Sequence, residues 1–363
     1  MPYQMIGTRR SGTNLLRVMI DQLPGFSAPQ STHELEYFTP LVPYYPDLNV
    51  DSNFMQFIDD MCRCVELNPA KWDGVVLDRY EIFNLCRERS IVAIFDAINV
   101  TAALQVKGAK DWMSKCPNYI NYAESFEQYW GEDIKYIYMY RDGRDIALSF
   151  TKAVAGDKHH YFIAKEWAKT QRAAQSLKRR ISPDRFFSVC YEELLQDPEE
   201  VCRRTAAFLG QPYTPDMLKF YENKSAKIAA ASSSLWENIA SPINTNNSKK
   251  WLAQSNESDI HIFESVAGAE LEMLGYERVT DYDLSFTVEE IETFSQINNS
   301  RKEKIMKTAH PDDMKRRNAQ KAHADQVRIR LGVPDHIQYD GNMIHKKTVV
   351  GNSDQSTTTT TMA

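Results

Sequence analysis

The sequence predicts an α/β fold with a central, mostly parallel sheet and a C-terminal helical extension. Short apolar runs alternate with helical patterns over the first 280 residues, which is typical of strand–helix–strand units. Polar loops follow the clearest strands, as expected where ligands bind at the carboxyl ends of parallel strands. Beyond residue 280 large apolar residues become rare and charged, helix-prone sequence predominates.

The first strand is expected where a short apolar run ends at Gly7, and the first helix where apolar residues recur at helical spacing after Gly12. We expect a proline-rich irregular stretch at 24–46 and a helix at 53–67. A short strand at 75–77 and a second helix at 90–104 should follow.

The strongest strand signal is the aromatic run 134–140, which Gly131 and Asp142 bound. After it we expect a helix at 145–152 and a long helix with a basic last turn at 160–180. A strand at 185–190 and a helix at 197–210, which Gly210 ends, should follow. Together these elements predict a sheet whose strands are separated by crossover helices.

The composition is that of a globular protein, with 363 residues, 42% of them hydrophobic and 25% charged. A net charge of −6 argues against a broad nucleic-acid surface, although a local anion site is compatible with it. The six cysteines are scattered without zinc-ligand spacing, so we expect neither a metal site nor a disulfide framework.

The sequence contains no signal peptide and no apolar run near 18 residues, so we expect no membrane span and a cytoplasmic location. We expect three parts, which are a main α/β domain over 1–280, a helical extension over 281–340 and a disordered tail over 341–363.

The first loop has the pattern of a phosphate cradle. A strand, a basic loop that Gly7 and Gly12 bound, and a helix follow one another, so that backbone N–H groups and a helix N-terminus would point at one anion. A Walker A loop would continue with Lys and then Ser or Thr, whereas Thr13 and Asn14 stand here and the charge lies on Arg10. The loop therefore favours a bound phosphate without metal-dependent transfer.

Three polar loops leave the most reliable strands, at 9–13, 141–144 and 191–193. Because the carboxyl ends of parallel strands lie at one edge of a sheet, we expect these loops to converge. Two of them carry paired arginines, which strengthens the prediction of an anion site.

Together the motifs resemble the sulfotransferases that use 3′-phosphoadenosine 5′-phosphosulfate (PAPS). The resemblance covers about residues 3–280 and is closest to the Arg-Ser-Gly-Thr type of the tyrosyl-protein and carbohydrate enzymes. The segments that carry it are Gly7-Thr-Arg-Arg-Ser-Gly-Thr-Asn14, Tyr140-Arg-Asp-Gly-Arg-Asp-Ile-Ala-Leu-Ser149, Tyr191-Glu-Glu-Leu-Leu-Gln-Asp-Pro198 and Ser248-Lys-Lys-Trp251. It implies a P-loop-like three-layer fold.

The resemblance assigns most of these residues to the nucleotide. The residues that would hold the 5′-phosphosulfate are Arg9, Arg10, Ser11, Gly12, Thr13 and Asn14. Those that would hold the 3′-phosphate are Arg141, Ser149, Ser234, Lys249 and Lys250, and Tyr191 would pack near the adenine.

Sulfuryl transfer also needs a base for the acceptor proton. The resemblance assigns this role first to Glu34 and second to His33. It matches Lys107, by position, to a lysine that stabilises the transferring sulfuryl group, and Arg10 would meet charge on the bridging oxygen.

We therefore expect a PAPS-dependent sulfotransferase with metal-independent, in-line transfer to a hydroxyl or amine of a small molecule, glycan or protein. Two alternatives remain open at this point, a P-loop-type small-molecule kinase and an inactive nucleotide-binding module.

Overall fold

The computed structural model describes residues 1–231, 238–309, 315 and 317–337. A five-stranded sheet lies at its centre, in the order β2-β3-β1-β4-β5. Every strand pair is parallel, which confirms the predicted α/β class. The strands are β1 (Pro2–Gly7), β2 (Phe26–Ser27), β3 (Asp111–Lys115), β4 (Lys135–Tyr140) and β5 (Phe186–Cys190).

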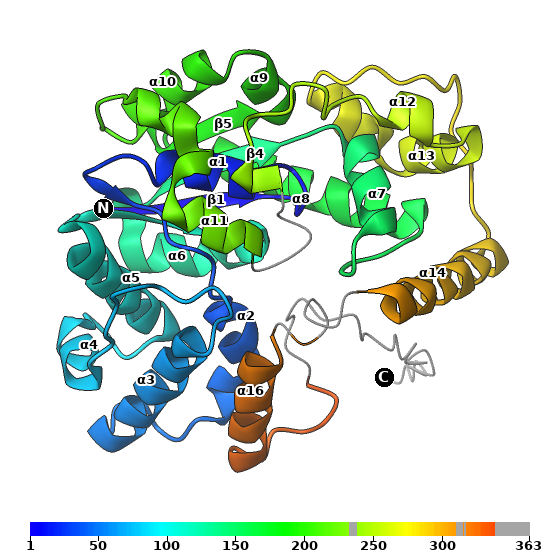
Figure 1. Cartoon of the computed structure of the whole chain (residues 1–363). Helices are drawn as coiled ribbons and strands as arrows, with labels where there is room; N and C mark the ends of the chain where they lie inside the picture. The colour runs from blue at the N-terminus through cyan, green and yellow to red at the C-terminus, as the bar shows by residue number, and fades with distance from the viewer. Residues whose placement is uncertain (232–237, 310–314, 316, 338–363) are drawn as a thin grey trace, which may run out of the picture.

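Helices cover both faces of the sheet, so the protein has three layers (Figure 1). Those of the N-terminal half are α1 (Thr13–Ile20), α2 (Glu34–Phe38), α3 (Asp51–Glu66), α4 (Arg79–Leu85), α5 (Ile91–Lys107) and α6 (Ala123–Trp130). Those that follow are α7 (Gly143–Lys152), α8 (His160–Arg180), α9 (Tyr191–Gln196), α10 (Pro198–Phe208), α11 (Lys224–Ala231), α12 (Trp251–Gln254), α13 (Glu257–Met273), α14 (Val288–Thr308) and α16 (Asn318–Arg330). Short 3-10 turns occupy Thr39–Tyr44, Pro117–Tyr122, Gly131–Asp133, Pro183–Arg185 and Pro215–Glu222.

Alternation along the strands divides the core between the two faces, because successive side chains of a strand point in opposite directions. In β4, Tyr136 and Tyr138 face the cluster that α3, α5 and α6 cover. Ile137 and Met139 face the cluster that α1 and α10 cover. Strands buried on both sides read as continuous apolar runs, which is why 134–140 gave the clearest strand signal.

Two expectations for the N-terminal half are wrong. Residues 75–77 form no strand, and the stretch 24–46, expected to be irregular, contains β2 and α2. β3 was not predicted either, because its five residues end in the polar Ser114 and Lys115. β3 lies directly beside β1, and β2 lies beyond β3 at the edge of the sheet. The residues that follow these two strands are therefore neighbours of the first loop.

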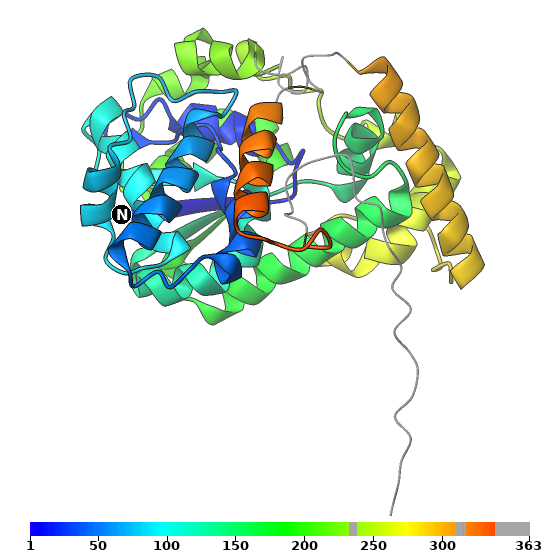
Figure 2. The same cartoon turned by 90° about the horizontal axis from the view of Figure 1, so that it is seen from below.

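The C-terminal segment returns to the N-terminal half of the molecule. Figures 1 and 2 both show α16 alongside α2 and α3, while α14 lies apart near α13. Ala324 and Val327 of α16 are buried in the core of that half. None of the described helices combines the length and the apolar character needed to cross a membrane.

Candidate active site

The loop after β1 is a tight turn at the carboxyl edge of the sheet. The Ser11 hydroxyl donates to the Thr8 carbonyl at 2.7 Å, and Ser11 is fully buried. Gly12 precedes α1 with φ of 89°, and a Cβ there would overlap the Tyr191 ring. Gly12 is therefore required for two reasons, which are its left-handed backbone conformation and the close approach of the Tyr191 ring.

Arg10 and Arg141 approach each other inside this edge, as the predicted convergence of the loops requires. Arg141 Nη1 donates to the Arg10 carbonyl at 3.2 Å, and Arg10 Nε donates to Ser149 Oγ at 2.9 Å. Burial, followed by the Arg141 charge, lowers the pKa of Arg10. The Nε atom of Arg141 is buried with no hydrogen-bond partner among the described residues. Two neighbouring arginines with an unsatisfied donor make this edge of the sheet a candidate site for a bound anion.

Tyr191 and Asn247 complete the far side of this group. The Arg141 guanidinium lies 4.3 Å from the centroid of the Tyr191 ring and donates to the Asn247 carbonyl at 2.7 Å. Asn247 Nδ2 donates to the Tyr191 hydroxyl at 2.7 Å. Tyr191 is thus held against the arginine, where one face of the ring is a cation–π partner.

Asp145 of α7 brings the segment around Lys249 into the site. Its carboxylate accepts from the backbone N–H groups of Lys249 at 2.7 Å and of Trp251 at 3.0 Å. Arg141 lies 3.5 Å from the same carboxylate. The Lys249 side chain is exposed and that of Lys250 is partly buried. Ser234, the remaining candidate for this end, lies outside the described residues.

Asn14 also lies in the first turn of α1 with an unsatisfied donor. Its Oδ1 accepts from Arg17 Nε at 3.3 Å, whereas its buried Nδ2 has no partner in the described part of the chain. Thr13 is buried beside it. These side chains occupy the positions that a Walker A loop fills with Lys and a magnesium ligand.

His33 and Glu36 form a second group, on α2 and at its N-cap. The two side chains share a hydrogen bond between His33 Nδ1 and Glu36 Oε2, and Asn118 Nδ2 donates to Glu36 Oε1 at 2.7 Å. Burial lowers the pKa of His33 to about 4. Burial alone would raise the pKa of Glu36, but His33, Arg9 and Asn118 lower it to about 2. The pair therefore consists of a neutral imidazole and an ionised carboxylate.

Glu34 points into a different environment, although it is one residue from His33. Its carboxylate accepts from the Thr32 hydroxyl, and Oε1 is buried without a partner among the described residues. Burial raises the pKa of Glu34 to about 7. Electrostatic contacts connect it with Cys64 and Tyr119, whereas the Arg9 charge of the first loop acts on Glu36.

Lys107 does not lie with the first loop. Its ammonium group donates to the carbonyls of Asp21, Leu23 and Phe26, the last at 2.9 Å, and lies 3.1 Å from the Asp21 carboxylate. These acceptors follow the carboxyl end of α1, whereas the loop lies at the amino end. Lys107 therefore neutralises a helix C-terminus, and its expected position beside the sulfuryl group is not what the structure contains.

Lys115 is a buried lysine near His33 that the sequence analysis did not single out. It ends β3, pairs in register with Met5 of β1, and is 7% exposed. Its charge acts on both His33 and Cys116. The sequence signal was a lysine at the end of a short strand next to β1, and it was lost because β3 itself was not predicted.

Three ligand-type atoms in this group could in principle hold a metal ion. His33 Nδ1, Glu36 Oε2 and Cys116 Sγ all lie within 4.8 Å of one another. However, Lys115 and Arg9 place positive charge on this group, and burial raises the pKa of Cys116 well above its ordinary value. Both features disfavour metal ligation by these atoms.

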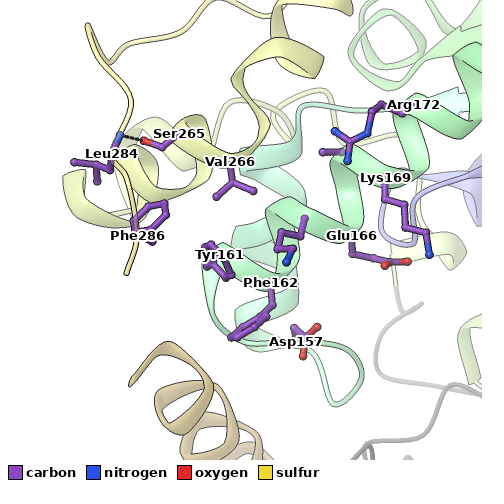
Figure 3. A pocket seen from close by; sticks show the side chains of 12 residues that line it. Asp157, Tyr161, Phe162, Glu166, Lys169, Arg172, Ser265, Val266, Leu284 and Phe286 are labelled. Carbon is purple, nitrogen blue, oxygen red and sulfur yellow. Dashed lines mark hydrogen bonds between the residues drawn. The ribbon is translucent and has the colours of Figure 1, made fainter. Parts of the chain in front are cut away.

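A separate cavity of about 590 Å³ opens between α8, α13 and residues 284–286 (Figure 3). Tyr161, Phe162 and Phe286 provide its apolar part, and Lys165 and Glu166 are among its charged residues. None of its lining residues belongs to the two groups described above. Its mixed charge does not select one class of ligand.

The fold is a P-loop-like α/β fold, with a candidate anion site at the carboxyl edge of its sheet. Residues 2–215 match the Sulfotransferase family, and the chain belongs to this family. The family assignment confirms the resemblance found in the sequence motifs. No curated protein sequence matches the chain.

Several solved structures are similar to this chain at low identity. The sulfotransferase domain of the Synechococcus PCC 7002 olefin synthase is 19% identical, with 78% of this chain and 96% of that chain covered and a TM-score of 0.48. The sulfotransferase domain from the curacin biosynthetic pathway is 18% identical, with coverages of 76% and 99% and a TM-score of 0.48. Retinol dehydratase in complex with retinol and PAP is 14% identical, with coverages of 79% and 83% and a TM-score of 0.36.

Proposed function

We propose that this chain is a sulfotransferase that moves the sulfuryl group of PAPS to a hydroxyl or amine of an acceptor. The observation that carries the proposal is the meeting of Arg10 and Arg141 at the edge of the sheet, where Arg141 donates to the Arg10 carbonyl, Arg10 donates to Ser149, and Arg141 has an unsatisfied donor among the described residues. Asp145 balances part of the charge of these two arginines, and a bound anion would balance the remainder. A nucleotide with a phosphate at each end of its ribose supplies that charge.

Arg10 and Arg141 would bind opposite ends of the nucleotide. Arg10, together with the N–H groups of residues 11–14 and the N-terminus of α1, would hold the 5′-phosphosulfate. Arg141 and the hydroxyl of Ser149 would hold the 3′-phosphate, because Ser149 accepts from Arg10 and retains its own proton to donate. Lys249 and Lys250 would add charge at this end, and Tyr191 would pack near the adenine.

His33 would act as the general base. Its Nδ1–H donates to the ionised Glu36, so the lone pair of Nε2 remains to accept a proton. As the acceptor oxygen or nitrogen bonds to sulfur, its proton would pass to Nε2. The bond from sulfur to the bridging oxygen would break, and the electron pair would leave with the 5′-phosphate of PAP. Lys115 and Arg10 would stabilise the charge that develops on the transferring group and on the leaving oxygen.

Glu34 remains the alternative base, because a pKa of about 7 also suits proton transfer near neutral pH. What favours His33 is the electrostatic connection of its partner Glu36 with Arg9 of the nucleotide loop. Glu34 instead accepts a hydrogen bond from the Thr32 hydroxyl, and its charge acts on Cys64 of α3.

Calorimetry with 3′,5′-ADP tests the proposal. We expect 3′,5′-ADP to bind tighter than 5′-AMP, and Arg141→Gln to weaken 3′,5′-ADP by about 2 kcal/mol, the size of a charge-assisted hydrogen bond. Arg203→Gln, on the exposed face of α10, is the matched charge control and should leave affinity unchanged. Equal binding of 5′-AMP and 3′,5′-ADP would contradict the 3′-phosphate assignment.

Two further outcomes would favour the alternatives. Binding of ATP with Mg²⁺ in preference to 3′,5′-ADP would indicate a small-molecule kinase. Binding of 3′,5′-ADP, with no transfer from labelled PAPS to any member of an acceptor library, would indicate an inactive nucleotide-binding module.

A further inference from the structure

The C-terminal helix α16 is fixed against the segment that carries the candidate base. Gln320 is fully buried, and its Nε2 donates to the Thr32 carbonyl at 2.8 Å and to the Cys64 carbonyl at 3.0 Å. His323 Nε2 lies 2.8 Å from the Asp60 carbonyl. Figure 2 shows this helix beside α2 and α3. The helix is therefore part of the wall around α2.

Arg317, immediately before the first turn of α16, is a buried cation without an acidic partner in the described part of the chain. It is 8% exposed, and its Nη1 donates to Gln320 Oε1 at 2.9 Å. Among the described residues no carboxylate lies within ion-pair distance of it. Arg144 and Arg185 are equally buried, and each is paired with a glutamate at 2.6 Å. A buried guanidinium normally has such a partner.

Arg317 lies near the segment that carries His33, because Gln320, to which it donates, binds the Thr32 carbonyl. Its charge acts on His33, and also on Tyr37 of α2 and Cys64 of α3. Lys115 reaches His33 from the sheet side. The Arg317 guanidinium is therefore a positive charge that the C-terminal segment adds near the candidate base.

Other polar atoms of the same wall also lack partners in the described part of the chain. They are Ser31 Oγ, Glu34 Oε1 and both amide atoms of Gln30, all of them buried. Glu34 does not neutralise Arg317, because its carboxylate bonds the Thr32 hydroxyl and makes no ion pair with the guanidinium. Unsatisfied donors and acceptors in the segment that Gln320 binds favour a polar ligand rather than an apolar one.

We propose that Arg317 binds an anionic group of the acceptor, a carboxylate, phosphate or sulfate, while the acceptor's hydroxyl or amine faces His33. This inference rests on the proposed function and specifies its acceptor class. It assigns to the C-terminal segment a binding role, with Gln320 orienting the guanidinium from within the same helix.

The test compares small aromatic anions with a neutral analogue of the same size. The protein is first saturated with 3′,5′-ADP and then titrated with benzoate, phenyl phosphate, phenyl sulfate and benzamide, with the thermal unfolding midpoint as the readout. We expect at least one anion to raise the midpoint and benzamide to leave it unchanged. Which anion is most effective distinguishes the carboxylate, phosphate and sulfate sources.

Substitutions locate the effect. Arg317→Gln should weaken the effective anion by about tenfold or more, the loss of a charge-assisted hydrogen bond, whereas Arg317→Lys should retain part of the affinity. Arg328→Gln is the matched control, since Arg328 lies on the same helix and pairs with the exposed Asp335 at 2.9 Å.

The proposal is overturned if no anion shifts the midpoint, if benzamide is as effective as the anions, or if Arg317→Gln and Arg328→Gln bind them equally. Should Arg317→Gln fail to fold, the wild-type comparison and Arg317→Lys decide the matter. Failure of the proposed function is seen separately, as absence of 3′,5′-ADP binding in the first titration.

Discussion

Replacing the buried carboxyl of Glu34 by an amide should stabilise the protein relative to wild type, and this advantage should grow as the pH rises. The side chain is fully buried, and burial raises its pKa from 4.5 to about 7. At about 1.36 kcal/mol per pKa unit, this rise corresponds to roughly 3 kcal/mol. Below pH 4.5 the carboxyl is protonated in the folded and unfolded states, so it imposes no penalty. Above pH 7 it must ionise inside the protein, and the full penalty applies.

The measurement is the free energy of unfolding of wild type and Glu34→Gln in urea, at intervals between pH 4.5 and 8.5. We expect the difference between the two proteins to grow with pH in favour of the variant, by about 3 kcal/mol over this range. A constant offset would reflect only the exchange of one polar group for another beside Thr32. A difference that is flat with pH, or that falls, would refute the assignment of a raised pKa to Glu34.

Glu36→Gln is the matched control, because Glu36 lies on the same helix and is equally buried but has the opposite shift. Its pKa is lowered to about 2, so its ionised form stabilises the folded state above pH 4.5, and that stability is lost as the pH falls toward 2. The variant should therefore be destabilised by a nearly constant amount between pH 5 and 8.5.

Three further predictions concern catalysis and the fold. His33→Gln should abolish transfer from PAPS while 3′,5′-ADP still binds in calorimetry. Glu36→Gln should lower kcat by tenfold or more with little change in KM. A retained kcat in either variant would contradict the assignment of His33 as the base and Glu36 as its partner. Gly12→Ala should lose 3′,5′-ADP binding, since a Cβ overlaps the Tyr191 ring; unchanged binding would show that the loop can move. Lys107→Met should lower the thermal midpoint and leave 3′,5′-ADP affinity intact, because its ammonium group binds carbonyls after α1.

Local sequence patterns predicted most of the long elements. The helix expected at 160–180 is α8, and the strands expected at 134–140 and 185–190 are β4 and β5. Each is a long periodic run or a continuous apolar run, so its own residues carry the signal. β3 carries a weaker one, since a run of five residues with polar ends resembles a loop. Missing β3 led to Lys107 rather than Lys115 as the candidate lysine.

The candidate site was predictable to the extent that it follows from strand ends. The meeting of Arg10, Arg141 and Tyr191 was expected because all three follow parallel strands of one sheet. The hydrogen bond between His33 and Glu36, and the return of α16 to α2, depend on tertiary packing. Neither leaves a pattern in neighbouring residues, so neither could be derived from local sequence.

The contact between Gln320 and Thr32 joins residues 288 positions apart. Closing so long a segment of chain is entropically expensive and slow, so we expect this contact to form late in folding. Until α16 arrives, the face of α3 that receives Ala324 and Val327 stays open to solvent. Nearly all residues up to the end of α16 must therefore be synthesised before this helix can pack beside the segment that carries His33.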